Sequence, residues 1–270
     1  MQKGGLTISA IEITTRIGCK IQCSYCPQTR LIKAYRDRSD VREMRFDTFK
    51  QCLAKIPPGV SIHFLGMAEP WLNPDCTKML MRSHEAGYRI SVSTTLMGMG
   101  PSDIEMFKSI PFDMFILHLP GDDNAMNLKV DDAYLHLLTQ ICNADLQNLR
   151  QKRFGNLHPD IEPIVKGVTE IQWPTMNRSN NLTGAPIPVT KKVKGNIKCH
   201  RIRNNVLLPN GEVALCCNDY GLRHIIGNLL TESYGALFKS DEFRKVRTGM
   251  KDNASEILCR YCSEPCMKVT

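Results

Sequence analysis

Three cysteines near the start of the chain, Cys19, Cys23 and Cys26, form a C-x3-C-x2-C loop. The loop follows an apolar, β-branched run, so the cysteines stand just beyond a predicted strand. Three soft thiolates at this spacing can all ligate one small iron–sulfur cube. A [4Fe–4S] cube has four irons, and the iron without a protein ligand is open to an external molecule. The spacing therefore favours a catalytic cluster.

Other uses of these cysteines stay open. A zinc site takes four protein ligands in a closed tetrahedron, often from paired C-x2-C units, whereas only Cys23 and Cys26 form such a pair here. A disulfide framework suits a small secreted domain, but this chain has 270 residues and no recognisable signal peptide. The three thiols could also be unconnected.

The loop resembles the signature of the radical S-adenosylmethionine (SAM) superfamily, in which an aromatic residue, here Tyr25, precedes the last cysteine. The resemblance implies that the open iron binds the amino and carboxylate groups of SAM. It also implies reductive cleavage of SAM to a 5'-deoxyadenosyl radical, with an external electron donor of the flavodoxin or ferredoxin type. Tyr25 is expected to lie near the adenine.

A second segment, G-M-A-E-P, begins at Gly66 after the apolar run 61–65. It resembles the G-G-E-P motif that holds the SAM ammonium in this superfamily, although Met67 and Ala68 replace the more usual glycine step. Small residues at a strand end leave backbone carbonyls accessible, and Glu69 adds negative charge.

A third segment, 89–95, reads as a buried strand that ends in Ser93, Thr94 and Thr95. Strands at this position in the superfamily often end near the SAM ribose, and we expect the three hydroxyls to donate to ribose oxygens. The alternative is an ordinary strand end capped by hydroxyl groups.

The second half of the chain carries six more cysteines, as C-x11-G-x4-C followed by C-x2-C-x3-C. This pattern resembles the SPASM extension, or its shortened twitch version, which follows many radical SAM barrels. A β-hairpin is predicted to turn at Asn210 and Gly211. The resemblance implies one auxiliary [4Fe–4S] cluster, held by Cys199, Cys216, Cys259 and Cys262.

The ligand set of this cluster has alternatives. Cys266 could replace Cys262 as the fourth ligand. Neighbouring residues on one strand point to opposite faces, so Cys216 and Cys217 should not both face one cluster. Cys217 would then be an unligated thiol, able to return a hydrogen atom to a substrate. A structural zinc ribbon could also use these cysteines.

The remaining cysteines, Cys52, Cys76 and Cys142, stand alone in helix-like segments and read as small core residues. So many free thiols favour a reducing cytoplasm. The chain lacks the apolar run of about eighteen residues that a membrane helix needs. Its net charge is +8, partly from the basic stretch 191–194, but no interleaved aromatic residues favour nucleic-acid binding there.

Predicted strands and helices alternate along the first two thirds of the chain, which favours a parallel sheet curled into a barrel. The superfamily implies a partial (β/α)6 barrel of the TIM type in residues 1–187, followed by a cysteine-rich SPASM/twitch domain in 188–270. The expected strands are 7–15, 61–65, 89–95, 114–118, 161–165 and 169–173, and the expected helices are 47–55 (capped by Asp47), 75–86, a short one after Pro101, and 131–153.

In βα barrels the chemistry lies at the carboxyl ends of the strands, where all three motifs fall. This position also nominates His118 for contact with SAM or substrate, and Arg178 as a substrate anchor. A core histidine and a solvated loop arginine are the alternatives.

The expected function is hydrogen abstraction from a small polar substrate, such as a sugar or aminocyclitol, leading to dehydrogenation or epimerisation. The alternative is peptide modification, as in the maturation of ribosomal peptides. Only about ten residues precede the first predicted strand, which leaves no room for an N-terminal peptide-recognition domain. A third hypothesis is a non-catalytic, metal-bearing protein that binds nucleic acid.

Overall fold

The computed structural model describes residues 9–171, 177–182, 189–262 and 267–268. Strands and helices alternate in the first part, as predicted. The elements there are β1 (Ala10–Ile13), α1 (Gln28–Arg36), α2 (Phe46–Leu53), β2 (Ser61–Phe64), η1 (Pro70–Leu72), α3 (Cys76–Glu85), β3 (Ile90–Thr94), α4 (Pro101–Phe107), β4 (Met114–His118), α5 (Asp132–Cys142), β5 (Leu149–Lys152) and α6 (Glu162–Val165). The second part contains β6 (Ile197–Lys198), β7 (Asn204–Leu207), β8 (Glu212–Ala214), β9 (Ile225–Asn228), α7 (Tyr234–Leu237), α8 (Asp241–Gly249), η2 (Leu258–Tyr261) and β10 (Met267–Lys268).

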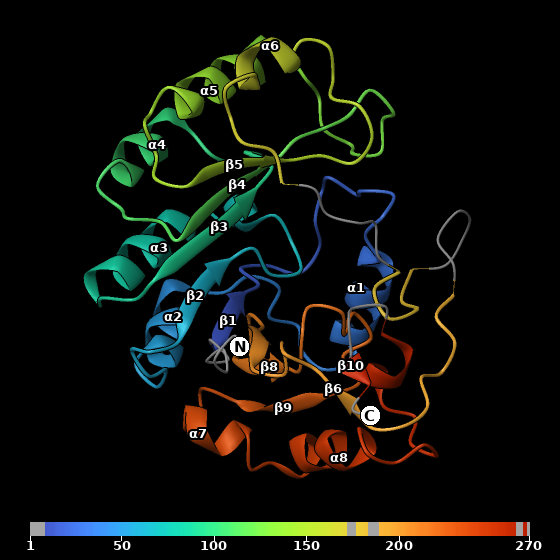
Figure 1. Cartoon of the computed structure of the whole chain (residues 1–270). Helices are drawn as coiled ribbons and strands as arrows, with labels where there is room; N and C mark the ends of the chain where they lie inside the picture. The colour runs from blue at the N-terminus through green and yellow to red at the C-terminus, as the bar shows by residue number, and fades with distance from the viewer. Residues whose placement is uncertain (1–8, 172–176, 183–188, 263–266, 269–270) are drawn as a thin grey trace, which may run out of the picture.

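One eight-stranded sheet runs through both parts, in the order β5-β4-β3-β2-β1-β7-β8-β9 (Figure 1). The pairs from β1 to β5 are parallel, and β7 also lies parallel to β1. The predicted hairpin is β7–β8, with Gly211 in its turn at φ +84°. The C-terminal hairpin therefore continues the barrel sheet, and β9 adds a further antiparallel strand.

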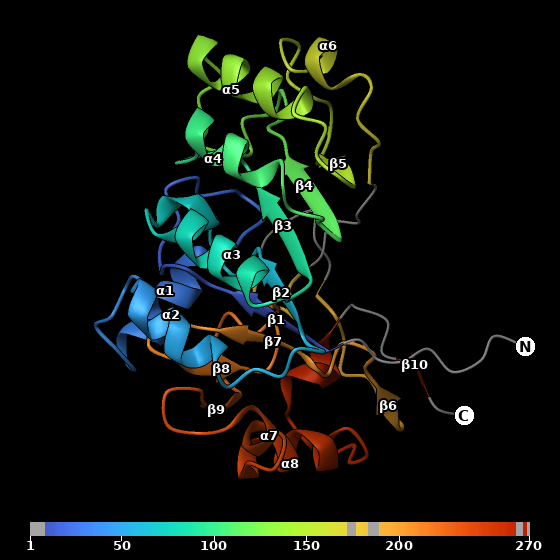
Figure 2. The ribbon, with the colours of Figure 1, turned by 90° about the vertical axis from the view of Figure 1, so that its left-hand side faces the viewer.

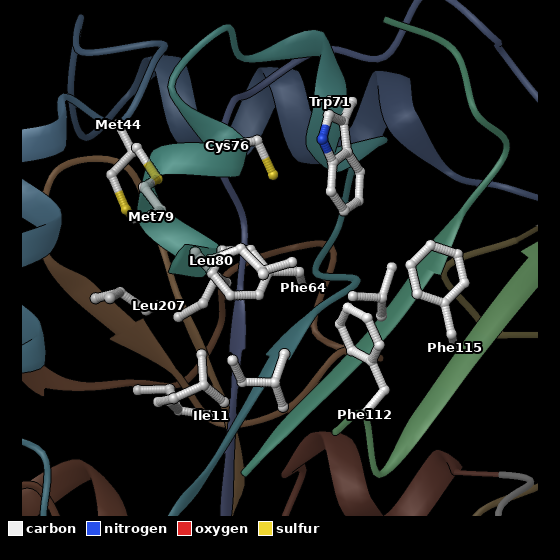
Figure 3. Close-up of a cluster of buried hydrophobic side chains, with 14 of the residues drawn as sticks. Ile11, Met44, Phe64, Trp71, Cys76, Met79, Leu80, Phe112, Phe115 and Leu207 are labelled. Atoms are coloured by element: carbon white, nitrogen blue, oxygen red, sulfur yellow. The ribbon is translucent and has the colours of Figure 1, made fainter. Parts of the chain in front are cut away.

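Two apolar clusters pack on opposite faces of this sheet. Val206 and Leu207 are neighbours on β7 and belong to different clusters, as strand alternation requires. The larger cluster lies beneath α2, α3, α4 and α5, which Figures 1 and 2 show along one side of the strands. Figure 3 shows Phe64 beside Leu80 of α3 in this cluster. The smaller cluster joins α1 to β7 and β8.

Local chemistry explains where several helices begin and end. The Asp131 carboxylate accepts a hydrogen bond from the Tyr134 amide at the start of α5. Gly87, at φ +78°, follows the end of α3, as predicted. The prediction that Asp47 caps the second helix was wrong, because α2 begins at Phe46 and Asp47 lies in its first turn. There its charge suits the helix dipole.

Three predicted elements differ from the structure. The expected helix 131–153 ends at Cys142, because Asp145 and Asn148 take positive φ angles and turn the chain into β5. The expected strand 161–165 forms the short helix α6, with Pro163 in its first turn. The expected strand 169–173 forms one bridge, between Glu170 and Gln151, and its remaining residues lie outside the described part.

The predicted domain boundary at residue 187 also lies outside the described residues and stays a prediction. Within the described part of the chain, no helix is long and apolar enough to cross a membrane.

Candidate functional site

The three N-terminal cysteines line one pocket at the carboxyl ends of the parallel strands. The loop that carries them is held against the segment after β4, since the Ser24 amide donates to Ala125 O at 2.8 Å and the Asn127 amide donates to Ile21 O at 2.7 Å. All eight residues that we predicted to bind SAM line this pocket too. They are Tyr25, Gly66, Met67, Ala68, Glu69, Ser93, Thr94 and Thr95.

The three thiols suit a metal cluster chemically. Burial, together with the neighbouring Cys26 and Cys19, raises the pKa of Cys23 to about 12. Burial likewise raises the pKa of Cys19. Buried, crowded thiols keep their protons until a cation replaces those protons, so metal loading is what would convert them to thiolates. Soft sulfur donors in this arrangement fit an iron–sulfur cluster.

Gly66 brings the ends of β1 and β2 into contact. A Cβ at this position would lie 2.5 Å from Ile13 O and 2.6 Å from Thr14 Oγ1, so only glycine fits. The close approach lets the Met67 amide donate to Thr14 Oγ1 at 3.0 Å. The G-M-A-E-P segment therefore runs along the pocket edge with its geometry set by two strands.

The Glu69 carboxylate is occupied by the protein itself. It accepts from Thr94 Oγ1 at 2.6 Å, from the Thr95 amide at 2.7 Å and from Thr95 Oγ1 at 2.8 Å. Burial raises the pKa of Glu69 against these hydrogen bonds, which lower it. Each threonine hydroxyl has one proton, and in this structure that proton goes to Glu69. The prediction that Thr94 and Thr95 contact the SAM ribose stays a prediction.

An aromatic group forms one wall of the pocket. The Tyr25 ring lies 4.3 Å from the Phe154 ring and 5.8 Å from the His118 ring, measured between centroids. Tyr25 Oη is 3.2 Å from His118 Nε2. Burial, together with the charges of Lys152 and Arg178, lowers the pKa of His118 to about 3. His118 is therefore neutral at physiological pH and belongs to the pocket wall.

This shift predicts a pH dependence of stability. The ordinary pKa of histidine is 6.5, so below that pH His118 is protonated in the unfolded chain but stays neutral in the folded protein. We expect the free energy of unfolding to fall as the pH decreases from about 6.5 toward the folded value. His118→Gln should flatten this slope in anaerobic urea titrations at several pH values, whereas His136→Gln, at an exposed position, should leave it unchanged. Equal slopes in the wild type and His118→Gln would contradict the assignment.

A second pocket is lined by five cysteines of the C-terminal part, together with Ser179, Arg201, Asn218 and Leu258. The cysteines are Cys199, Cys216, Cys217, Cys259 and Cys262. Burial raises the pKa of Cys259 to about 12, with Cys199 and Cys262 adding to the effect. The four predicted auxiliary ligands thus share one pocket, whereas Cys266 lies outside the described residues.

Cys216 and Cys217 both line this pocket, and the prediction that they do not both face one cluster stays a prediction. The two residues follow the end of β8 and lie in a turn, in which the Asp219 amide donates to Cys216 O at 3.0 Å. Strand alternation does not govern side-chain directions in a turn.

Single-metal geometry is not what these cysteines form. In the described part of the chain, no three His, Cys, Asp or Glu side chains converge as ligands of one metal ion would. Cysteines that hold a cube bind different irons and surround it, so each pocket is consistent with a cluster.

Cationic side chains lie between the two pockets. Arg201 Nη2 is 3.5 Å from Cys217 Sγ and 3.6 Å from the buried Glu12 carboxylate. Arg178 lines the first pocket, and its neighbour Ser179 lines the second. Lys152 lies close enough to Arg178 for the two charges to interact, and burial together with Arg178 lowers the pKa of Lys152 to about 8.

Arg178 sits in an unusual backbone segment. Arg178, Ser179 and Asn180 all have positive φ angles, between 50° and 62°, which for residues other than glycine is strained. The turn is held by Asn181, whose Nδ2 donates to Arg178 O at 2.7 Å and to Asn218 O at 2.6 Å. This strained turn is what directs Arg178 and Ser179 toward different pockets.

Several pocket residues escaped the sequence analysis. Gln28 Nε2 donates to Met67 O and to Cys26 Sγ, and its place just after the cysteine loop was a signal that could have been used. Tyr220 had no such signal, since it is far from the cysteine loop in sequence, and the same holds for Phe154, which packs on the pocket residue Tyr25.

Known proteins share this architecture. Residues 199–263 match the family model SPASM, an iron–sulfur cluster-binding domain. The chain is similar to BtrN in complex with AdoMet and 2-DOIA, with 18% identity, a TM-score of 0.65, and coverage of 95% of this chain and 93% of BtrN. No curated protein sequence matches the chain.

Two other solved structures show the same fold. One is anSMEcpe with bound AdoMet, at 11% identity and a TM-score of 0.60, with 96% of this chain and 92% of that one covered. The other is Streptococcus suis SuiB bound to the precursor peptide SuiA, at 12% identity and a TM-score of 0.61, with 95% and 71% covered. These likenesses confirm the predicted barrel fold, and the family model confirms the predicted C-terminal domain.

Proposed function

We propose that this chain, a barrel of the radical SAM fold with a C-terminal SPASM domain, is a radical SAM enzyme that acts on a small polar substrate. One observation carries the proposal: Cys19, Cys23 and Cys26 line the same pocket as all eight residues that the sequence predicts to bind SAM. A [4Fe–4S] cluster held by these cysteines and SAM bound at its open iron would supply a 5'-deoxyadenosyl radical that removes a hydrogen atom from a C–H bond.

The chain's own residues would bind and orient SAM. Backbone groups of Met67 and Ala68, at the pocket edge, bind the ammonium, and Ser93 is left to contact the ribose. Glu69 acts indirectly, because its carboxylate ties the ends of β2 and β3 together. Tyr25, packed on Phe154, offers an aromatic face to the adenine.

Substrate would lie between the two pockets. Arg178 anchors a polar group there, and its bidentate guanidinium suits oxygen acceptors. The SPASM domain holds an auxiliary [4Fe–4S] cluster through Cys199, Cys216, Cys259 and Cys262, which would supply an electron acceptor for dehydrogenation. Cys217, which also lines the second pocket, would return a hydrogen atom to the substrate if the outcome is epimerisation. A flavodoxin or ferredoxin would supply the first electron.

A small substrate is supported by the likeness to BtrN, which extends over nearly the whole of both chains and concerns a complex with 2-DOIA. A peptide substrate is the second candidate, because SuiB is bound to a precursor peptide and anSMEcpe has been captured with the Cp18Cys peptide.

The test uses anaerobically reconstituted protein, SAM and a reductant. We expect about eight irons with matching sulfide per chain, and reductive formation of 5'-deoxyadenosine. Incubation with perdeuterated sugars and aminocyclitols should transfer deuterium into 5'-deoxyadenosine for the correct substrate class. Deuterium transfer from labelled peptides alone would favour the second candidate. Zinc in place of iron, with no SAM cleavage, would refute the enzyme hypothesis.

A further inference from the structure

A tyrosine of the C-terminal domain reaches the N-terminal cysteine loop. Tyr220 Oη lies 3.6 Å from Cys26 Sγ, although the two residues are 194 positions apart. Tyr220 lies within the segment that matches the SPASM model, four residues after Cys216. Its side chain is 4% exposed, so the contact is shielded from water.

The backbone around Tyr220 is rigidly built. The Asp219 amide donates a hydrogen bond to Cys216 O. The Asp219 carbonyl oxygen accepts a hydrogen bond from the Leu222 amide at 2.9 Å. The Asp219 carboxylate accepts from the amides of Arg223 and His224, at 2.9 Å and 2.8 Å. The turn that carries Cys216 and Cys217 therefore also determines where the phenol of Tyr220 lies.

Packing holds the ring from the other side. Tyr220 belongs to the smaller apolar cluster, in which Leu31 of α1 and Met67 are also buried and Cys26 packs at the edge. The phenol consequently has little freedom to turn away from Cys26. Gln28 Nε2 approaches the same sulfur at 3.5 Å, so two donors converge on one cysteine.

The direction of the Tyr220 hydrogen bond follows from ligation. A cysteine that ligates iron has lost its proton, so Cys26 can only accept and the phenol must donate. Donation to a ligand sulfur withdraws electron density from it and favours the reduced cluster, which carries more negative charge.

We propose that Tyr220 is a positioning residue through which the SPASM domain raises the reduction potential of the SAM-binding cluster. This inference rests on the proposed function, because it requires Cys26 to ligate that cluster. It assigns the C-terminal domain a second role besides holding the auxiliary cluster. The reducibility of the catalytic cluster then depends on correct folding of the turn at Cys216–Tyr220.

The test is a redox titration of the reconstituted protein followed by electron paramagnetic resonance. The SAM-binding cluster is identified as the signal that changes when SAM is added. In Tyr220→Phe, we expect the ratio of reduced to oxidised cluster at a fixed potential to fall about tenfold, as for the loss of one hydrogen bond to a charged group. For a one-electron couple this corresponds to about 59 mV. Tyr134→Phe, which removes another buried hydroxyl, should leave the ratio unchanged.

A second measurement keeps Tyr220 in place, so it does not require that the Tyr220→Phe variant can be reconstituted with its cluster. In Gln28→Leu, which removes the other donor to Cys26, the reduced cluster should still show one strongly coupled proton that exchanges in D2O. An unchanged potential in loaded Tyr220→Phe, or no exchangeable proton in Gln28→Leu, would overturn the inference while leaving the proposed function intact. Absence of any SAM-responsive cluster signal in the wild type would overturn both.

Discussion

Replacing Cys19, Cys23 and Cys26 together with alanine is expected to reduce SAM cleavage to the background of the reductant alone. The reason is that these three thiols are the protein ligands proposed for the cluster, and no other cysteine among the described residues lines the pocket they share. The auxiliary pocket lies apart from them and keeps its own cysteines. About half of the iron, and the absorbance of the second cluster, should therefore remain.

Liquid chromatography of 5'-deoxyadenosine, combined with iron and sulfide analysis, measures both quantities. Cys142→Ala, in a cysteine of α5 outside both pockets, is the matched control and should retain full cleavage. The complementary change, Cys199→Ala with Cys216→Ala, should lose the auxiliary iron and keep the SAM-responsive signal. Continued reductive cleavage in the triple variant would show that the N-terminal loop is not the catalytic centre.

Arg260→Met is expected to destabilise the C-terminal domain by about 3–5 kcal/mol, because three buried carbonyl oxygens each lose a hydrogen bond from a charged donor, at about 1–1.5 kcal/mol apiece. Arg260 has no exposed surface and lies between Cys259 and Cys262. Its guanidinium donates to three backbone oxygens, those of Gly249, Val193 and Gly195, at 2.8–3.1 Å. The change leaves these three carbonyl oxygens buried without a donor. It also removes the contacts that hold the backbone segment between Cys259 and Cys262, the two predicted auxiliary ligands.

Chemical unfolding under anaerobic conditions and iron analysis test this prediction. We expect a lower unfolding midpoint and loss of auxiliary iron, with the SAM-binding cluster retained. Arg247→Met, at an exposed site on α8, is the control that changes net charge equally and should be nearly neutral. Wild-type stability in Arg260→Met would mean that the three carbonyls find other donors.

The sequence was most informative where chemistry depends on neighbours along the chain. The spacing of Cys19, Cys23 and Cys26 is local, so the loop could be recognised without a structure. Strand ends were also predictable, because β2, β3 and β4 are short apolar runs of strand-forming residues. The rule that chemistry gathers at the carboxyl ends of parallel strands then brought the motifs together before any geometry was known.

Local reasoning failed where tertiary contacts override propensity. Residues 149–152 read as a continuation of a helix, yet they pair with β4 as β5. The sequence also does not reveal that the Glu69 carboxylate lies within hydrogen-bonding distance of the Thr94 and Thr95 hydroxyls.

The sequence by itself determined the chemistry of this protein: which sulfur atoms are grouped, and which strands carry them to a common edge. Only the tertiary structure decided how the two cysteine pockets are connected, through the turn at Arg178 and through the contact of Tyr220 with Cys26. The physical reason is that spacing along a chain encodes ligands within one loop. A contact between residues 194 positions apart, by contrast, arises only when the sheet places β7 beside β1 and β8 beside β7.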